Sequence, residues 1–349
     1  MRHPAAPYHE HAPRSEAERI CAEHELPCKR DRFGNLLVVF NSAARQRPVA
    51  LAAHLDHPGF EILRPLSANR WLARFRGGVP DAYFRPGVPV RLMPGGIRAK
   101  LGLRQGPDMT FEIRASKPAK TEPGFAVWEL KDFAVREGRI HGRSCDDLVG
   151  VATILATLIE LKRQRTRTNV LGVISRAEEV GFHGALAFAA SGGLPENSLV
   201  ISLETSRELP GVKMGKGVVL RVGDRTSIFN PEAMRYIAQV AGELSRRQED
   251  FQFQRALMSG GTCEATAYQE FGFQTAAVCV ALGNYHNCGG RNRIQAEYVS
   301  ISDVCSMVDL LAAAAAEIPQ YARLTGKLPQ QLNQLLREAR RNLPGTAED

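Results

Sequence analysis

Apolar and polar residues alternate along the chain with two different periods, which predict different elements. After Asp146, short apolar runs typical of buried strands alternate with longer segments in which apolar residues recur every three or four positions, as in helices. The predicted strands are Val170–Ile174, Leu199–Leu203 and Thr275–Leu282, and the predicted helices are Leu148–Lys162, His183–Ala190, 231–247 and Ile301–Ile318. Strands that alternate with helices indicate an α/β fold with a mostly parallel sheet flanked by helices.

The N-terminal part of the chain has a less uniform pattern. Residues 15–25 predict a helix, and Leu36–Phe40 and Val49–Ala53 predict two strands. From about Ile62 to Ile140, short apolar pieces are separated by Gly and Pro, which is typical of a small all-β module. We therefore expect a small β-barrel domain inserted between two parts of the α/β domain.

This change of pattern also predicts the domain boundaries. The α/β domain is assigned to 1–62 and 140–325, the inserted β domain to 63–139, and a basic helical tail to 326–349. In the tail, leucines at helical spacing form one apolar stripe, at Leu328, Leu332, Leu335 and Leu336. Such a stripe usually packs on the protein's own core or on another subunit.

Composition and charge exclude several classes of protein. Of the 349 residues, 44% are hydrophobic and 23% are charged, which excludes a mainly disordered chain. We expect no membrane partner and a cytoplasmic location, because no apolar run approaches the roughly 20 residues that a bilayer requires and no signal-peptide core is present. The seven cysteines include no C-x-x-C pair, which suits reduced thiols. The net charge of +8 is dispersed and favours a solvated basic surface over nucleic-acid binding.

Histidines and carboxylates gather where the predicted strands end and where the helix after the β module begins. These residues are His54, Asp56, Asp146, Glu178, Glu179, Glu204 and His286. The carboxyl ends of strands in α/β sheets meet at one edge, where ligands bind. We therefore expect these side chains to converge on a single site.

The converging residue types point to a dinuclear metal site. Two histidines and several carboxylates form a set of nitrogen and oxygen ligands suited to zinc, cobalt or manganese. Asp56 is placed to orient the imidazole of His54, and Asp146 at a helix start can bridge two ions. Of the adjacent glutamates 178 and 179, one can bind metal while the other remains the general base for a water whose pKa the metal lowers to about 7.

Other chemistries find little support in the sequence. It contains no G-x-S-x-G elbow, no H-E-x-x-H, no Walker loop and no G-x-G-x-x-G after a strand. Cys145 and Cys288 flank the predicted site, but a thiolate nucleophile is disfavoured beside so many carboxylates.

Several short motifs together resemble those of the tetrahedral-aminopeptidase family, which includes glutamyl, lysyl and deblocking aminopeptidases within the clan of dinuclear-zinc exopeptidases. The matching pieces are Asp31–Asn35, Ala53–Gly59, Gly142–Asp147, Ala177–Gly184, Gly215–Gly217, Gly260–Thr262 and Tyr285–Asn287. They occur in the order of the family and extend over about residues 15–318.

The resemblance implies a role for each site residue. It implies that Asp146 bridges two divalent ions, that His54 and Glu204 complete one site, and that Glu179 and His286 complete the other. It further implies Glu178 as general base for a water between the ions, Asp56 as the residue that orients His54, and an inserted β domain. The implied reaction removes an N-terminal residue from a peptide substrate, and the implied assembly is a large homo-oligomer, often a dodecamer.

The sequence departs from the family pattern at three places. Glu204 stands where the family usually has Asp, and His57-Pro58 replaces Glu-Ile. Cys263-Glu264 follows Gly-Gly-Thr where Asp-Ala is common. This last loop is expected to help shape the substrate pocket.

Two alternatives to an aminopeptidase remain open. A metal-dependent deacylase or amidohydrolase would use the same metal site on small N-acyl substrates, and a requirement for a free amine distinguishes the two enzymes. A catalytically inactive binder of the same fold is the third hypothesis. The complete set of predicted ligands and base argues against it.

Overall fold

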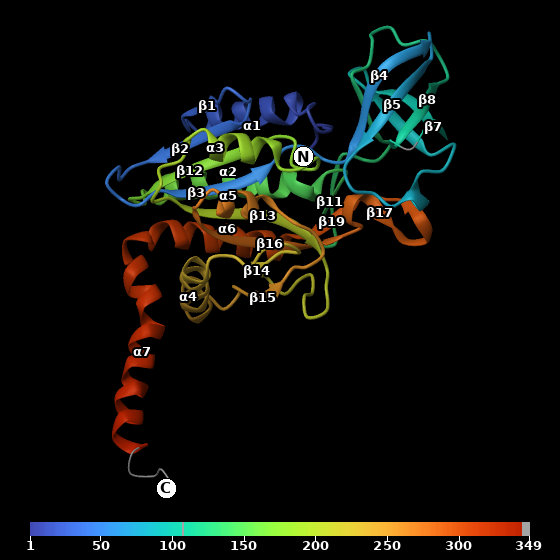
Figure 1. Ribbon diagram of the computed structural model, residues 1–349. Helices are drawn as coiled ribbons and strands as arrows, with labels where there is room; N and C mark the ends of the chain where they lie inside the picture. Colours follow the sequence, from blue (N-terminus) through green and yellow to red (C-terminus); the bar gives the residue numbers. More distant parts are fainter. Residues whose placement is uncertain (107, 344–349) are drawn as a thin grey trace.

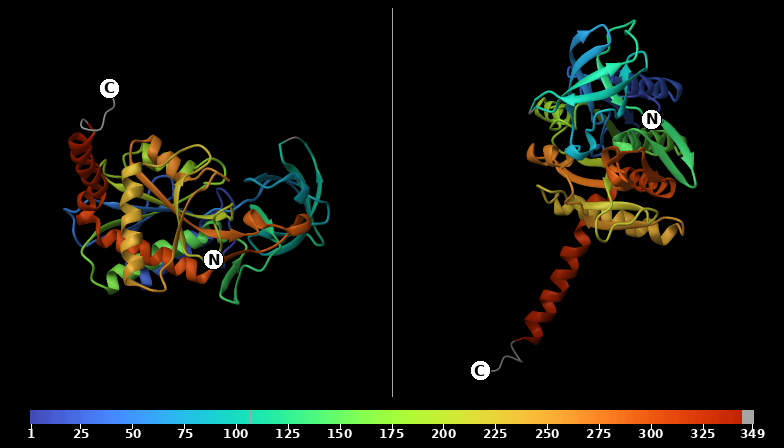
Figure 2. Two further views of the ribbon diagram at one scale, coloured as in Figure 1. Left: turned by 90° about the horizontal axis from the view of Figure 1, so that it is seen from below. Right: turned by 90° about the vertical axis from the view of Figure 1, so that its right-hand side faces the viewer.

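The chain folds into a large sheet with helices on both faces and a separate barrel. The computed structural model describes residues 1–106 and 108–343 (Figure 1). Over these residues there is one 11-stranded sheet, a two-stranded sheet and one closed barrel. The barrel lies beyond one end of the large sheet, and the C-terminal helix projects from the opposite side of the molecule (Figure 2). The predicted fold class, α/β with an additional β-barrel, is confirmed.

The large sheet is parallel at its centre and antiparallel toward its edges. Its main order is β1-β2-β12-β3-β13-β16-β19-β11-β10, with β14 and β15 on a branch from β16. The central strands β12, β3, β13 and β16 pair in parallel. The outer pairs β1–β2 and β10–β11 are antiparallel, because short hairpin connections permit no other arrangement.

The strands of this sheet have the following bounds: β1 Cys28–Arg30, β2 Leu36–Asn41, β3 Val49–His54, β10 Phe133–Arg136, β11 Arg139–Gly142, β12 Asn169–Ser175, β13 Leu199–Arg207, β14 Val218–Gly223, β15 Phe253–Leu257, β16 Gln274–Gly283 and β19 Glu297–Ser300. The two-stranded sheet consists of β17 Cys288–Gly289 and β18 Arg293–Ile294.

Both faces of the central strands are buried, which explains their continuous apolar sequences. All six residues of β3 are buried, and successive residues face different cores. Val49 and Leu51 contribute to the core that includes α2 and α6, whereas Ala50 and Ala52 contribute to the core that includes α3. Parallel strands covered on both sides require this kind of sequence rather than an apolar-polar alternation.

The helices are α1 His11–Glu23, α2 Cys145–Arg163, α3 His183–Ala190, α4 Pro231–Arg247, α5 Glu264–Glu270, α6 Ile301–Ala316 and α7 Tyr321–Asn342. The predicted bounds of α3 and α4 agree with the structure. Helix α4 begins where predicted because Asn230 caps it, its side chain accepting hydrogen bonds from the N–H groups of Glu232 and Ala233, while Pro231 occupies the first turn.

The barrel is closed by the strands β4 Gly59–Ser67, β5 Arg70–Arg76, β8 Thr110–Ala115, β7 Ile97–Arg104, β6 Pro89–Met93 and β9 Phe125–Trp128. Its interior is aromatic, with the rings of Phe75 and Trp128 centred 4.9 and 5.0 Å from that of Phe60. The hairpin of β10 and β11 pairs with β19 in the large sheet, although the predicted boundary at 139 falls inside it. Apolar spacing identifies such strands but not the sheet that they join. The division into domains therefore stays a prediction.

The C-terminal helix α7 begins on the body of the molecule and then leaves it. Leu324 is buried, and the Nζ of Lys327 donates a hydrogen bond of 2.8 Å to Glu243 in α4. Farther along, the leucines of the predicted apolar stripe are 43–58% exposed, at Leu328, Leu332, Leu335 and Leu336. The stripe thus does not pack on the core of its own chain, and residues 344–349 of the predicted tail lie outside the described residues. Among the helices of the described residues, none is long and apolar enough to cross a membrane.

Candidate metal centre

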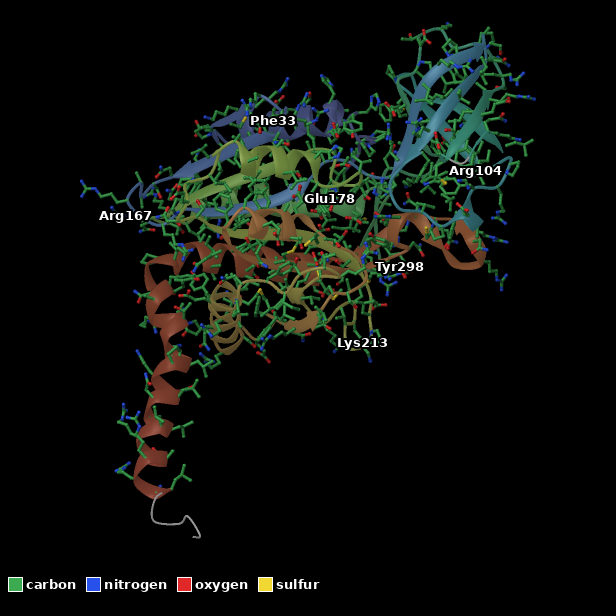
Figure 3. All side chains as sticks on the ribbon, in the orientation of Figure 1. Phe33, Arg104, Arg167, Glu178, Lys213 and Tyr298 are labelled. Carbon is green, nitrogen blue, oxygen red and sulfur yellow. The ribbon has the colours of Figure 1, made fainter. Side chains whose placement is uncertain are left out.

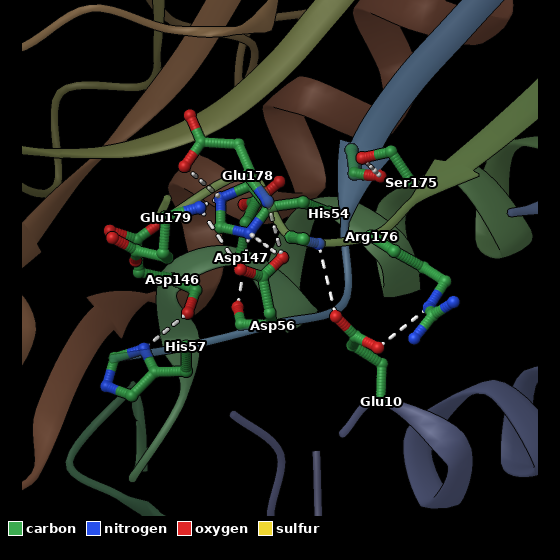
Figure 4. Close-up of polar contacts among 12 residues, drawn as sticks. Glu10, His54, Asp56, His57, Asp146, Asp147, Ser175, Arg176, Glu178 and Glu179 are labelled. Atoms are coloured by element: carbon green, nitrogen blue, oxygen red, sulfur yellow. Dashed lines mark hydrogen bonds and ion pairs between the residues drawn. The ribbon is translucent and has the colours of Figure 1, made fainter. Parts of the chain in front are cut away.

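The predicted site residues converge at one end of the sheet. Figure 4 shows five of them close together, His54, Asp56, Asp146, Glu178 and Glu179. His54 is the last residue of β3, Glu178 and Glu179 follow β12, and His286 follows β16. Asp146 lies at the start of α2, where its φ of −81° and ψ of 107° are not helical. Glu178 lies among the interior side chains, whereas Arg167 and Lys213 reach the periphery (Figure 3).

The position of Glu204 corrects the prediction that it follows its strand. Strand β13 continues to Arg207, so Glu204 lies within it. The pairing of β13 with β3 ends at Ser202, but its pairing with β16 continues to Arg207. Glu204 therefore lies just beyond the paired part of the two strands, level with His54 at the end of β3.

One group of potential ligands consists of His54, Asp146 and Glu204. One ligand atom from each residue lies within 4.8 Å of the others, and all three residues are buried. The Nε2 of His54 is 3.5 Å from the Oδ1 of Asp146. Among the described residues, Asp146 Oδ1 and Glu204 Oε1 have no hydrogen-bond partner. Buried carboxylate oxygens of this kind are costly unless a cation or a donor is present.

The second group consists of Asp146, Glu179 and His286, with ligand atoms again within 4.8 Å of one another. The Nε2 of His286 is 3.4 Å from the Oδ2 of Asp146 and 3.1 Å from the Oε1 of Glu179. Two ligand atoms bound at about 2.1 Å to a tetrahedral ion lie about 3.4 Å apart. The measured separations match this spacing, so the residues fit metal ions on both sides of Asp146.

Both histidines present the correct ring nitrogen to these groups. The Nδ1 of His54 is 3.1 Å from the backbone oxygen of Asp56, and the Nδ1 of His286 is 2.7 Å from that of Gly78. A carbonyl oxygen can only accept, so each Nδ1 carries a proton and each Nε2 is the nitrogen that can bind a metal ion once it is deprotonated. Hydrogen bonds of this type orient histidine ligands and increase their basicity.

The carboxylate of Asp56 holds the glutamate loop, residues 176–182 between β12 and α3, which carries Glu178 and Glu179. Its oxygens accept hydrogen bonds from the N–H groups of Glu178 at 2.9 Å and Glu179 at 3.1 Å. Its Oδ1 is also 3.6 Å from the Nδ1 of His54, farther away than the backbone oxygen of Asp56. Asp56 therefore contacts both the histidine and the glutamate loop.

Two further residues at this site were not identified from the sequence. The carboxylate of Glu297 accepts hydrogen bonds from the N–H groups of Asp146 at 3.0 Å and His286 at 2.8 Å. His57 bonds the backbone oxygen of Asp146 through Nδ1 at 2.7 Å and contacts Asn287 through Nε2 at 3.0 Å. The presence of His57 where the family has Glu was a signal for it. No comparable signal marks Glu297, because β19 has the mixed sequence Glu-Tyr-Val-Ser.

Burial and the crowding of charge shift the ionisation of the site in the absence of ions. Burial, together with the nearby Glu204 and Glu179, raises the pKa of Glu178 well above its usual range, although His54 opposes this. Burial also raises the pKa of Glu204 to about 8. Burial alone would lower the pKa of His54, but Glu178 and Asp146 raise it well above its usual value. Such an excess of buried acidic groups is suited to receiving cations.

A cavity of about 350 Å³ opens over the two ligand groups, with Phe182, Arg225 and Tyr285 on its walls. It adjoins a smaller cavity of about 30 Å³, and Glu204 and Tyr285 line both. Arg207 and Arg221 line the smaller cavity. The arrangement provides space for a substrate next to the ligands and a basic recess beside it.

The sheet flanked by helices, with its additional barrel, places the chain in the class of proteins that have the zinc-exopeptidase fold. More particularly, a family model described as M42 glutamyl aminopeptidase matches residues 109–310, and the chain belongs to this family. The resemblance to the tetrahedral aminopeptidases is thereby confirmed. Membership makes the chain a hydrolase that acts on peptide bonds as an aminopeptidase.

Individual relatives are distant in sequence but similar in fold. A protein of Acetivibrio thermocellus named "Putative aminopeptidase" is 24% identical over 307 residues, which cover 82% of this chain and 87% of the relative. The TET1 peptidase of Pyrococcus horikoshii, which can assemble into a tetrahedron or a large octahedral shell, matches with a TM-score of 0.75 and 23% identity over 90% of this chain and 96% of its own. A TET aminopeptidase from a marine sediment archaeon of the Thaumarchaeota has a TM-score of 0.76 at 18% identity, over 91% of this chain and 96% of its own.

Proposed function

We propose that this chain is a dinuclear-metal aminopeptidase that removes N-terminal residues from peptides. His54, Asp146 and Glu204 would hold one divalent ion, and Asp146, Glu179 and His286 would hold the other. The observation that carries this proposal is the carboxylate of Asp146, whose two oxygens lie 3.5 and 3.4 Å from the Nε2 atoms of two different histidines. Zinc, cobalt and manganese suit this set of nitrogen and oxygen ligands.

When bound, the two ions supply Lewis-acid polarisation of the scissile carbonyl and a water nucleophile at neutral pH. The chain itself supplies the base. Glu178 belongs to neither ligand group, although its Oε2 is 3.9 Å from the Nε2 of His54. It would take the proton from the attacking water and give it to the leaving nitrogen. Burial raises the pKa of Glu178, so its carboxylate accepts a proton more readily than a free glutamate does.

The smaller cavity supports a preference for an acidic N-terminal residue. Arg221 lines this cavity and is 3% exposed. Its Nη1 donates to the hydroxyl of Ser206 at 3.2 Å and its Nη2 to the carbonyl of Gly261 at 3.3 Å, while its Nε finds no acceptor among the described residues. A carboxylate is the group that a buried, partly unpaired guanidinium binds best. We therefore propose this recess as the site for a Glu or Asp side chain, consistent with the family's description.

We also propose a homo-oligomer. The support comes from the assemblies of the TET relatives and from the leucine stripe of α7, whose side chains are 43–58% exposed. Apolar stripes at helical spacing are usually covered in the functional state. We also propose that residues 63–139 form a domain inserted into the α/β domain.

The function is tested by removing metal, restoring zinc, cobalt or manganese, and measuring release of p-nitroaniline from aminoacyl substrates with free and N-acetylated amines. We expect metal-dependent release from the free-amine substrates alone. Glu178→Gln should lower kcat by about 10²–10⁴-fold while two ions remain bound. The matched control is Glu196→Gln, because Glu196 is exposed and should not affect turnover.

Two outcomes would overturn the assignment. Activity confined to acetylated substrates would identify a deacylase, and two bound ions without turnover of either set would identify an inactive binder. Arg221→Met tests the side-chain preference separately. It should lower kcat/KM roughly ten- to hundredfold for a glutamyl substrate but little for a leucyl substrate. Equal losses on both substrates would show that Arg221 acts on the nearby carboxylate of Glu204, whose pKa its charge lowers, and does not bind the substrate side chain.

A further inference from the structure

The N-terminal segment of the chain lies against the loop that carries Glu178 and Glu179. We call residues 4–10 the N-terminal strap. Pro4, Ala5, Ala6, Pro7 and Glu10 of the strap are buried, and Glu10 is 0% exposed. The carboxylate of Glu10 points toward the start of the glutamate loop (Figure 4). A fully buried carboxylate requires strong partners, so the contacts of Glu10 identify what it holds.

Glu10 binds the first two residues of the loop and also its own strap. Its Oε1 accepts hydrogen bonds from the N–H groups of Ala177 at 3.1 Å and Tyr8 at 2.7 Å. Its Oε2 accepts from the Nε of Arg176 at 2.7 Å. The guanidinium of Arg176 also donates to the backbone oxygens of Tyr8 at 3.1 Å and Phe33 at 3.0 Å. The buried ion pair thus joins the strap to the loop.

The strap also reaches the other end of the loop. The hydroxyl of Tyr8 lies 2.9 Å from the Nδ1 of His183, the first residue of α3. Phe182, immediately before it, lines the cavity over the ligand groups. The strap therefore contacts the glutamate loop at its first residues and at the point where it enters α3.

These contacts continue directly into those made by Asp56. The N–H of Ala177 donates to Glu10, and the next two N–H groups, those of Glu178 and Glu179, donate to Asp56. Three consecutive N–H groups are thus fixed by two buried carboxylates from distant parts of the chain. Ala177 also has a left-handed φ of 53°, which a non-glycine residue adopts only when its surroundings impose it.

We propose that Glu10 is a positioning residue for Glu178. Glu10 touches neither ligand group and is not placed to contact substrate. It acts by fixing the backbone at Ala177, so that the side chain of Glu178 starts from a defined position in every turnover. This inference rests on the proposed role of Glu178 as general base. The N-terminal strap, which precedes all the site residues in the sequence, would thus affect the rate of catalysis.

The test compares Glu10→Gln with Glu23→Gln, both loaded with zinc. Glu10→Gln replaces one of the two carboxylate oxygens by an NH2 group. Either the N–H of Ala177 or the guanidinium of Arg176 then faces a donor instead of an acceptor. Glu23 lies on α1, where it is exposed and forms an ion pair with Arg19, so its variant is a matched control. We expect Glu10→Gln to lower kcat about 10–100-fold, the usual effect of losing a residue that orients a catalytic group. In Glu10→Gln, the changes in KM, zinc content and thermal midpoint should be too small to account for the loss of kcat. Glu23→Gln should behave as wild type.

Hydrogen exchange provides a second measurement that needs no turnover. Amides of residues 177–179 should exchange at least about tenfold faster in Glu10→Gln than in wild type or Glu23→Gln. Unchanged exchange, or a loss of kcat accompanied by equal losses of zinc and thermal stability, would overturn the proposal. If wild type lacks aminopeptidase activity, the proposed function fails, while the exchange data still decide whether the strap holds the loop. Should Glu10→Gln not fold, Glu10→Asp keeps the charge but shortens the side chain that reaches Ala177, and it should raise exchange at 177–179. Unchanged exchange there would also contradict the proposal.

Discussion

The two ligand groups that share Asp146 are built in different ways. In the first group, His54 ends β3 and Glu204 lies within β13, and these two strands pair with each other in the parallel centre of the sheet. In the second group, Glu179 and His286 lie in the segments after β12 and β16, and His286 has a left-handed φ of 53°. The first group is positioned by the sheet itself, and the second by side chains and carbonyls from elsewhere.

This difference shows where the site is robust and where it is adjustable. His286 depends on Glu297 in β19 and on the carbonyl of Gly78 next to the barrel, and the glutamate loop depends on Asp56 and Glu10. Local opening concentrates in segments with few backbone ladder contacts. We therefore expect the ion beside His54 to bind more tightly and the ion beside His286 to be lost first.

The largest effect should come from Asp146→Asn, which disturbs both groups at once. An amide offers one oxygen and one NH2 group, so one of the two ions loses its ligand and the bridge is broken. Activity should fall by more than the roughly 10–100-fold that is typical when a residue that hydrogen-bonds to a metal ligand is replaced. Ion content measured by mass spectrometry should drop from two per chain. Tight retention of both ions would contradict a bridging role, and the exposed Asp250→Asn serves as control.

A selective effect is expected for Glu297→Gln. The amide nitrogen of Gln would face the N–H of either Asp146 or His286, both of which donate to the carboxylate in the native chain. The affinity for the ion beside His286 should weaken about 10–100-fold, with little change beside His54. Titration against a chelator, fitted with two dissociation constants, measures this. Equal weakening of both sites would mean that the two groups are not supported independently.

The metal-free protein should lose stability between about pH 6 and pH 8. Burial raises the pKa of Glu204 to about 8, so the folded state keeps a proton that the unfolded state releases above 4.5, and stability falls as the pH rises through this window. His54 and His286, whose folded pKa values are raised despite their burial, add stability below 6.5 that is lost in the same direction. Thermal unfolding of chelator-treated protein at both pH values tests this. Added zinc should remove most of the difference in thermal midpoint between pH 6 and pH 8. A metal-free protein that is more stable at pH 8 than at pH 6 would contradict this prediction.

The smallest effects are expected from alanine substitutions at Gly77 and Gly78. The carbonyl of Gly78 contacts the Nδ1 of His286. A Cβ at Gly78 would meet His286 at 3.9 Å, an ordinary contact, so Gly78→Ala should change activity less than about twofold. At Gly77 a Cβ would lie 2.7 Å from Pro58, and the φ of 112° disfavours any side chain. Gly77→Ala should therefore weaken the ion beside His286 measurably. The same chelator titration distinguishes them, and equal behaviour of the two variants would show that the carbonyl of Gly78 does not position His286.

The sequence predicts the strand-borne part of the site better than its supports. His54, Glu178 and His286 could be predicted because apolar runs end just before them, and even Glu204 was identified although β13 is longer than its apolar run. The supports that Glu297 gives to Asp146 and Gly78 gives to His286 were not predicted, because these contacts join residues 151 and 208 positions apart, respectively. Their roles arise only when β19 and the barrel fold against the sheet.

The same limit explains the fold. Helices α3 and α4 were predicted with correct bounds because apolar spacing is a local signal, and the cap at Asn230 fixes the start of α4. The hairpin of β10 and β11 resembles the barrel strands in sequence, and only its pairing with β19 assigns it to the large sheet. Local patterns thus define elements, and long-range pairing defines which layer each element joins.

The most direct test of the central claim is an anomalous difference map from crystals of the zinc-loaded protein, measured at the zinc absorption edge. Two peaks on opposite sides of the Asp146 carboxylate, one near His54 and Glu204 and one near His286 and Glu179, are the predicted result. A single peak, or peaks that do not contact Asp146, would contradict the dinuclear centre.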